Sequence, residues 1–192
     1  MRAITLDIET TSASAMRGRL DPAQQELTVV AIHDSKTGEY SSYFKEELPR
    51  LWPLIEQADL LIGFNSDTFD IPILNRYYPG DLSAIHSLDL LVEVQKALGR
   101  RIRLQLLAEA TLDRGKSGSG LKAIDWWAQG KYDEVRKYCI EDVRITRELY
   151  DYALTHHKLK YKDLSDIRDI KLDTRTWNIP QTKPALTYTL PI

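Results

Sequence analysis

The chain has 192 residues, with 26 Lys or Arg against 28 Asp or Glu, which gives a net charge of −2 at pH 7. This balance excludes a strongly basic nucleic-acid coat protein, and the single cysteine excludes an intrachain disulfide and a cysteine-based zinc site. Apolar runs are shorter than the roughly 20 residues that a membrane helix needs, and the N-terminus lacks a signal-peptide pattern. We therefore expect one cytoplasmic domain in a reducing compartment, without membrane contact.

Strand and helix patterns alternate along the first 155 residues, which is typical of an α/β domain. A helix that begins near Phe69 would be capped by Ser66, Asp67 or Thr68 and would tolerate Pro72 in its first turn. In chain order we expect a strand at 2–8, a hairpin of strands 27–34 and 40–44, a helix within 46–57, a strand at 59–64, the helix from Phe69, a short strand at 84–87, and helices at 89–97, 104–112, 121–129 and 131–155.

The composition changes after Lys158, where the chain becomes basic and then rich in Pro and Thr. Residues 167–177 have the pattern of an added strand or hairpin, followed by a loosely held end. We therefore expect a main domain over residues 1–157 and a C-terminal extension over residues 158–192.

Acidic side chains occur in three segments where apolar ones would be expected. In the first strand, Asp7 and Glu9 share one face, because side chains alternate along a strand. In the last long helix, Tyr138 and Asp142 are four residues apart, so their Cβ atoms should lie about 5–6 Å apart, and Asp142 falls within the apolar stripe. A fourth acid, Asp70, lies between these two segments.

Each of these signals also has a purely structural interpretation. A D-x-E pair often marks a solvated strand end, Asp70 could cap a helix, and Tyr138 with Asp142 could form a structural hydrogen-bonded pair. Their joint occurrence favours a site. The GKSGSG block around Lys116 is not a Walker A loop, because Ala110 stands where the first Gly is required and no strand precedes it. We interpret this block as a basic loop near the substrate.

Four carboxylates within about 5 Å would repel one another by roughly 3 kcal/mol per pair at an effective dielectric near 20. Cations would stabilise the cluster, and hard oxygen ligands favour Mg²⁺ or Mn²⁺. Two such ions suit in-line attack on a phosphodiester. Asp7 would bridge both ions, Glu9 and Asp142 would hold the one that activates water, Asp70 would complete the other site, and Tyr138 would orient the water.

The segments DIET, N-x-x-x-F-D and Y-x-x-x-D resemble, in order and spacing, the three exonuclease motifs of the DEDDy branch of the DEDD 3′–5′ exonuclease superfamily. The FDIPIL block is similar to the exonuclease domain of family B DNA polymerases. The branch with a histidine five residues before the last Asp matches less well, because that position is Lys137. The resemblance implies a ribonuclease H-like α/β fold, with a central mixed five-stranded sheet in the order 3-2-1-4-5, an antiparallel strand 2, and helices on both sides.

The resemblance also implies the activity, a two-metal 3′–5′ exonuclease that releases nucleoside 5′-monophosphates from single-stranded nucleic acid, with DNA favoured and RNA second. Thr10 would bind the terminal 3′-hydroxyl through its backbone N–H, and Asn65 and Phe69 would hold the last bases. A helicase or a polymerase is the expected partner. The alternatives are a catalytically silent or partner-activated binding module, and a structure-specific endonuclease on the same fold.

Overall fold

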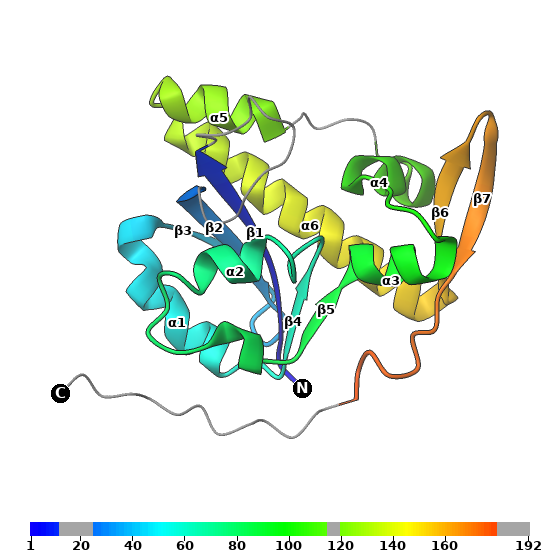
Figure 1. Cartoon of the computed structure of the whole chain (residues 1–192), viewed down its shortest axis with the longest axis horizontal. Coiled ribbons are helices and arrows are strands. Elements are labelled where there is room, and N and C mark those ends of the chain that lie inside the picture. Colours follow the sequence, from blue (N-terminus) through cyan, green and yellow to red (C-terminus); the bar gives the residue numbers. More distant parts are fainter. Residues whose placement is uncertain (12–24, 115–119, 180–192) are drawn as a thin grey trace.

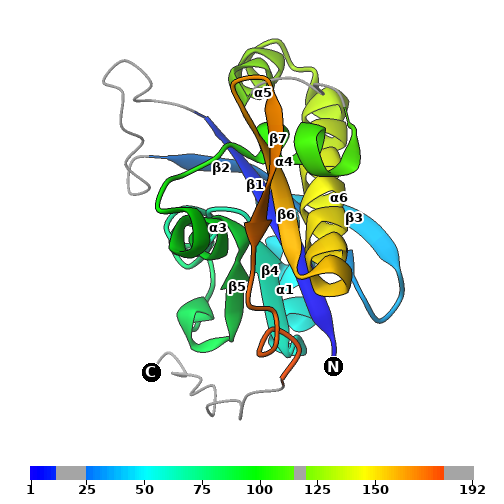
Figure 2. The same cartoon turned by 90° about the vertical axis from the view of Figure 1, so that its right-hand side faces the viewer.

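The computed structural model describes residues 1–11, 25–114 and 120–179, which form a mixed sheet with helices on both faces and a separate hairpin (Figure 1, Figure 2). The sheet order is β3-β2-β1-β4-β5, with β2 antiparallel to β1 and to β3, and with β1, β4 and β5 parallel. This confirms the predicted fold class. The strands are β1 (Ala3–Thr11), β2 (Glu26–Asp34), β3 (Glu39–Phe44), β4 (Leu60–Gly63) and β5 (Ser87–Asp89).

Helices cover the two faces of the sheet in separate groups. One apolar cluster joins β1 and β2 to α1 and α2, and two others join the opposite face to α4, α5 and α6. Within the described ranges, no helix has both the length and the apolar character needed to span a membrane. The helices are α1 (Leu48–Glu56), α2 (Asp70–Leu74), α3 (Leu90–Leu98), α4 (Leu104–Leu112), α5 (Gly120–Ala128) and α6 (Tyr132–His156), with 3₁₀ turns at Lys45–Glu47 and Leu82–Ala84.

The alternation along β1 sets the direction of the acids. Ile4, Leu6 and Ile8 are buried against α1 and α2, so the residues between them face the other side of the sheet, where α6 packs. The sequence alternation predicts this arrangement. It places Asp7 and Glu9 under α6.

Two strand boundaries differ from expectation. The first strand continues beyond residue 8 to Thr11, because it stays paired with β2 as far as Glu26. The short strand lies at 87–89 instead of 84–87, because Asp81 accepts a hydrogen bond from Ser83 N–H and caps a 3₁₀ turn over Leu82–Ala84.

The expected cap of α2 is also wrong. The helix begins at Asp70, its N-cap is Phe69, and no side chain caps it. Two of the expected capping residues have other partners, since Asp67 accepts a hydrogen bond from Ser87 and the Thr68 hydroxyl donates one to the Asn65 side chain.

The chain after α6 forms a hairpin of β6 (Lys158–Asp163) and β7 (Asp166–Lys171), which starts earlier than the expected 167–177. Leu159, Tyr161 and Ile170 of this hairpin are buried in the cluster that includes α4 and α6. Thr111 on α4 exchanges hydrogen bonds with the backbone of β6. Figure 2 shows β6 and β7 beside these two helices.

Candidate active site

The site forms where β1 extends beyond its parallel neighbour. β1 pairs with β2 along nearly its whole length, but β4 pairs with it only opposite Ala3, Ile4 and Thr5. The second half of β1 therefore has one edge that no strand covers. Asp7 and Glu9 lie in this half and are partly exposed.

Asp70 reaches this uncovered edge from the start of α2. Its side chain is 4% exposed, and its Oδ1 accepts a hydrogen bond from the backbone N–H of Ile8 at 3.1 Å. The contact takes the place of a strand-to-strand hydrogen bond that β4 is too short to make. Although α2 packs on the other face of the sheet, its first residue thus places a carboxylate at the edge of β1 beside Asp7 and Glu9.

Helix α6 supplies the remaining residues. Tyr138 and Asp142 are buried one turn apart, and one carboxylate oxygen from each of Asp7, Glu9 and Asp142 lies within 4.8 Å of the others. Between them, the Cys139 thiol lies 3.3 Å from the Asp7 carbonyl oxygen and 3.5 Å from the Asp7 carboxylate. The helix therefore packs directly on the acidic end of β1.

Burial and mutual repulsion make the carboxylates reluctant to ionise. Burial raises the pKa of Asp70 to about 7 and that of Asp142 to about 6, although hydrogen bonding by Tyr138 opposes the latter. The pKa values of Asp7 and Glu9 are raised well above the usual range by burial, and then by the charges of Asp142 and Asp70. Burial, and then the charges of Asp142, Glu9 and Asp7, raise the pKa of the Tyr138 hydroxyl, which stays protonated.

The donor set fits hard divalent cations. Asp142 Oδ1 is buried and has no hydrogen-bond partner among the described residues. Burying a polar atom without a partner costs free energy, so such an oxygen needs a ligand that the described residues do not supply. Clustered carboxylates suit Mg²⁺ or Mn²⁺ as ligands, and a cation would relieve both the missing contact and the repulsion. The residues present therefore fit a divalent metal centre.

The predicted substrate-binding residues lie on the segments that border this cluster. Thr10 follows Glu9 on β1, and Asn65 and Phe69 lie on the connection from β4 to α2. Asn65 adopts a left-handed backbone conformation with φ 67°, which Asn tolerates better than most residues. Phe69 is partly buried against the cluster under α1 and α2. Lys116 lies outside the described residues.

A β-bulge fixes the orientation of the Thr10 peptide. Glu9 pairs with Val29 and Thr10 with Leu27, so Thr28 is the extra residue on β2, and its hydroxyl donates to the Glu9 carbonyl at 2.8 Å. In a trans peptide the N–H points away from the carbonyl. The Thr10 N–H is therefore directed away from β2, toward the edge that Asp70 borders.

Three further residues, outside the predicted set of site residues, border the site. Asp89 is buried at the end of β5 and accepts hydrogen bonds from the N–H groups of Asn65 (2.8 Å) and Asp67 (3.2 Å). Gln105 on α4 donates to the Tyr138 hydroxyl at 3.5 Å, and Arg101 donates to the Asn65 side-chain oxygen. Asp89 could have been found from the sequence, because an acid at the end of a short strand of a parallel sheet is a candidate for a site residue. The other two contacts depend on tertiary structure.

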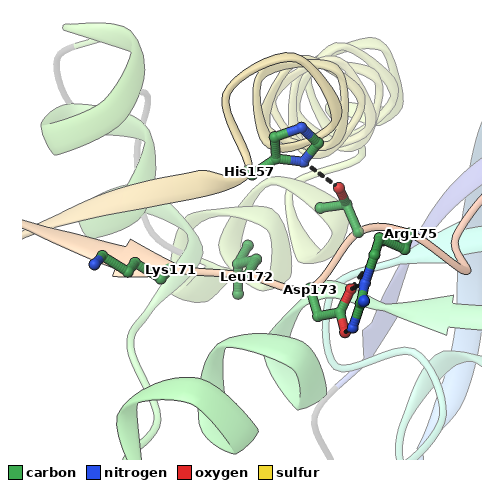
Figure 3. Close-up of a pocket in the computed structure, with 6 residues that line it drawn as sticks. His157, Lys171, Leu172, Asp173 and Arg175 are labelled. Carbon is green, nitrogen blue, oxygen red and sulfur yellow. Dashed lines mark hydrogen bonds and ion pairs between the residues drawn. The ribbon is translucent and has the colours of Figure 1, made fainter.

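A hollow of about 510 Å³ lies elsewhere, at the C-terminal end of α6 (Figure 3). Its residues partner one another: His157 contacts Thr174, and Arg175 is held by Asp173. None of the predicted site residues lines it.

Comparison with known proteins places the chain in a family. A family model of the RNase_H superfamily matches residues 4–154. The family B DNA polymerase of the hyperthermophilic archaeon Pyrobaculum calidifontis is similar in structure, with a TM-score of 0.61 and 19% identity over 80% of this chain. The matched region is 24% of that polymerase, and no curated protein matches. The predicted ribonuclease H-like fold and the likeness to a family B polymerase are confirmed, and the chain belongs to the RNase_H superfamily.

Proposed function

We propose that this protein is a metal-dependent 3′–5′ exonuclease of the DEDDy type that hydrolyses single-stranded nucleic acid to nucleoside 5′-monophosphates. The observation that carries the proposal is the convergence of Asp7, Glu9 and Asp142 within 4.8 Å, beside Asp70. Membership of the RNase_H superfamily supports nuclease chemistry in general. The order of the three motifs supports the finer assignment.

The acids would provide the ligands for two divalent cations. Asp7, Glu9 and Asp142, whose carboxylate oxygens lie together, would hold the ions, with Asp70 as a further ligand beside them. When bound, such ions activate a water for in-line attack and stabilise the leaving 3′ oxygen. Tyr138 keeps its proton and can therefore donate a hydrogen bond that orients the attacking water.

The terminal nucleotide would bind along the uncovered edge of β1. The Thr10 N–H points to this edge and would donate to the terminal 3′-hydroxyl. Asn65 and Phe69 would hold the last one or two bases, with the Phe69 ring against a base face. Lys116, outside the described residues, is proposed as a further substrate-binding residue.

We assign this activity to residues 1–157 and treat residues 158–192 as an extension. Single-stranded DNA is the first choice of substrate because the FDIPIL block is similar to that of polymerase domains, and short RNA is the second. A helicase or a polymerase is the proposed partner.

The polarity of cleavage tests the proposal. We expect 5′-labelled single-stranded oligonucleotides, incubated with Mn²⁺, to shorten one nucleotide at a time, and circular single strands to remain intact. Cleavage of the circle would support the endonuclease alternative. Binding of both polymers without cleavage would support the silent or partner-activated module.

A further inference from the structure

Two consecutive arginines join the candidate site to the β6–β7 hairpin. Arg100 and Arg101 lie on the connection between α3 and α4, and both are exposed. The Arg101 guanidinium donates to the side chain of Asn65, next to the start of α2. Arg100 extends in a different direction, with its guanidinium 5.1 Å from the centre of the Tyr161 ring on β6. This connection therefore contacts the site with one residue and the hairpin with the next.

A third arginine, Arg168, lies on β7 of the hairpin. Arg168 on β7 is directly opposite Tyr161, so the two side chains share a face. Asp163 lies between the arginines, 3.9 Å from the nearest Arg100 nitrogen and 3.0 Å from the nearest Arg168 nitrogen. These three arginines, which we call the arginine track, carry three positive charges, and Asp163, which contacts two of them, pairs across the hairpin with Asp166.

The track remains available for a ligand. The side chains of Arg100 and Arg168 are 54% and 56% exposed, and ion pairs at such exposure contribute little to stability. A guanidinium has five N–H donors, and the contact with Asn65 uses only part of the Arg101 set. Because the whole chain has a net charge of −2, this concentration of cations does not reflect a generally basic surface.

We propose that the arginine track binds the sugar–phosphate backbone of the substrate strand upstream of its 3′ end, and leads the strand from Asn65 to the hairpin. Guanidinium groups match phosphate geometry, and contacts to phosphates fix the register of a strand without reading its sequence. The inference rests on the proposed function for the direction of the strand. The binding itself is independent of cleavage and can be measured without it.

The test is the salt dependence of binding to a fluorescent single-stranded DNA oligonucleotide of about 12 nucleotides, in EDTA, so that hydrolysis cannot occur. The variant Arg100→Gln with Arg101→Gln removes two charges. We expect this variant to bind about 10- to 30-fold more weakly than the wild type near 0.1 M salt. The slope of the logarithm of its association constant against the logarithm of the salt concentration should be less steep by about 1.4. In the wild type, affinity should rise as the oligonucleotide lengthens from about 3 to about 12 nucleotides, and the variant should lose this gain.

The hairpin also provides a matched control. Lys162 and Lys171 are exposed on its opposite face, because they alternate with the inward residues of β6 and β7. The double variant Lys162→Gln with Lys171→Gln should keep the wild-type slope. Replacing Arg100 and Arg101 with Lys should restore most of the slope, which excludes misfolding as the cause of the loss.

Three results would overturn the inference: an unchanged slope in the Arg100 and Arg101 variant, an equal loss in the lysine control, or wild-type binding to anionic phospholipid vesicles and not to the oligonucleotide. If the wild type binds through the arginines and never cleaves with Mn²⁺, the track stands and the proposed exonuclease activity falls. If the wild type cleaves stepwise and the Arg100 and Arg101 variant has the wild-type slope, the exonuclease activity stands and the arginine track falls.

Discussion

The Asp70 carboxylate accepts a hydrogen bond from the backbone N–H of Ile8, with 3.1 Å between Oδ1 and N, although 62 residues separate the two in sequence. This bond connects the start of α2 to β1 at the level where β4 has ended. It gives Asp70 a structural role, anchoring the β4–α2 connection, in addition to its proposed role as a metal ligand. The two roles can be separated by mutation.

Asp70→Asn keeps a side-chain oxygen that can accept from Ile8 but removes the charge. We expect a folded protein that has lost metal-dependent cleavage. Asp70→Ala should in addition leave the Ile8 N–H without its partner, and so lower the free energy of unfolding by about 1–3 kcal/mol relative to Asp70→Asn. Urea unfolding of the two variants in EDTA measures this difference. Equal stability of the two would contradict the anchoring role.

The sequence predicts which acids of the candidate site face inward, because strand alternation and helical spacing are local properties. Asp7 and Glu9 share one face of β1 and Asp142 is buried on α6, as those periodicities predict, and the packing of α6 on β1 then brings the three together. The capping of α2 could not be predicted in this way. Asp67 and Thr68 are good capping residues, but their side chains bind Ser87 and Asn65, which approach only in the folded chain.

The hairpin after Lys158 illustrates a second limit. Its lysines alternate with apolar residues, yet a strand pattern alone does not reveal what the apolar face packs against. Contact with α4, made through Thr111 and the buried Leu159, fixes where the hairpin begins. Arg100 and Arg101 are adjacent in sequence, and their separate contacts likewise follow from the tertiary structure.

The stability of the metal-free protein should fall with rising pH through its acidic cluster. The pKa values of Asp70 and Asp142 are raised from 3.8 to about 7 and about 6. The stability that they contribute is present below about pH 3.8 and is lost as the pH rises to about 7, because the unfolded chain releases these protons first. Since cations bind the ionised carboxylates, Mn²⁺ should raise the melting temperature more at pH 8 than at pH 5.

The control for this pH dependence is Asp142→Asn, which removes one titrating group while the acids elsewhere in the chain stay the same. Its melting temperature in EDTA should depend less on pH than that of the wild type, and Mn²⁺ should raise it less. Equal Mn²⁺ stabilisation at pH 5 and pH 8 would argue against a carboxylate metal site, as would equal stabilisation of the variant.

The hydroxyl of Tyr138 should affect catalysis more than folding. Tyr138→Phe keeps the buried ring and its edge contact with Trp126, but removes the group that hydrogen-bonds to Asp142. We expect kcat to fall about 10- to 100-fold with little change in melting temperature. Steady-state cleavage with Mn²⁺ checks this, with Tyr152→Phe at the far end of α6 as the control. A fall in KM alone, with kcat unchanged, would contradict the role in orienting water.

Asp89 should be required to position the β4–α2 connection, although no metal role is proposed for it. Its carboxylate accepts from the N–H groups of Asn65, Asp67 and Leu91. Asp89→Ala would leave these donors without their partner, and we expect a loss of at least about 2 kcal/mol in the free energy of unfolding. Urea unfolding measures the loss, and wild-type stability of the variant would contradict the assignment.

A label at the 3′ end tests directly whether the acidic cluster cleaves single strands from that end. A single-stranded oligonucleotide with a labelled 3′-terminal nucleotide would be incubated with Mn²⁺ and with wild type or Asp7→Asn. We expect the first product released by the wild type to be the labelled nucleoside 5′-monophosphate, and the variant to release none. Label that leaves first in longer fragments, or release that persists in the Asp7→Asn variant, would contradict this expectation.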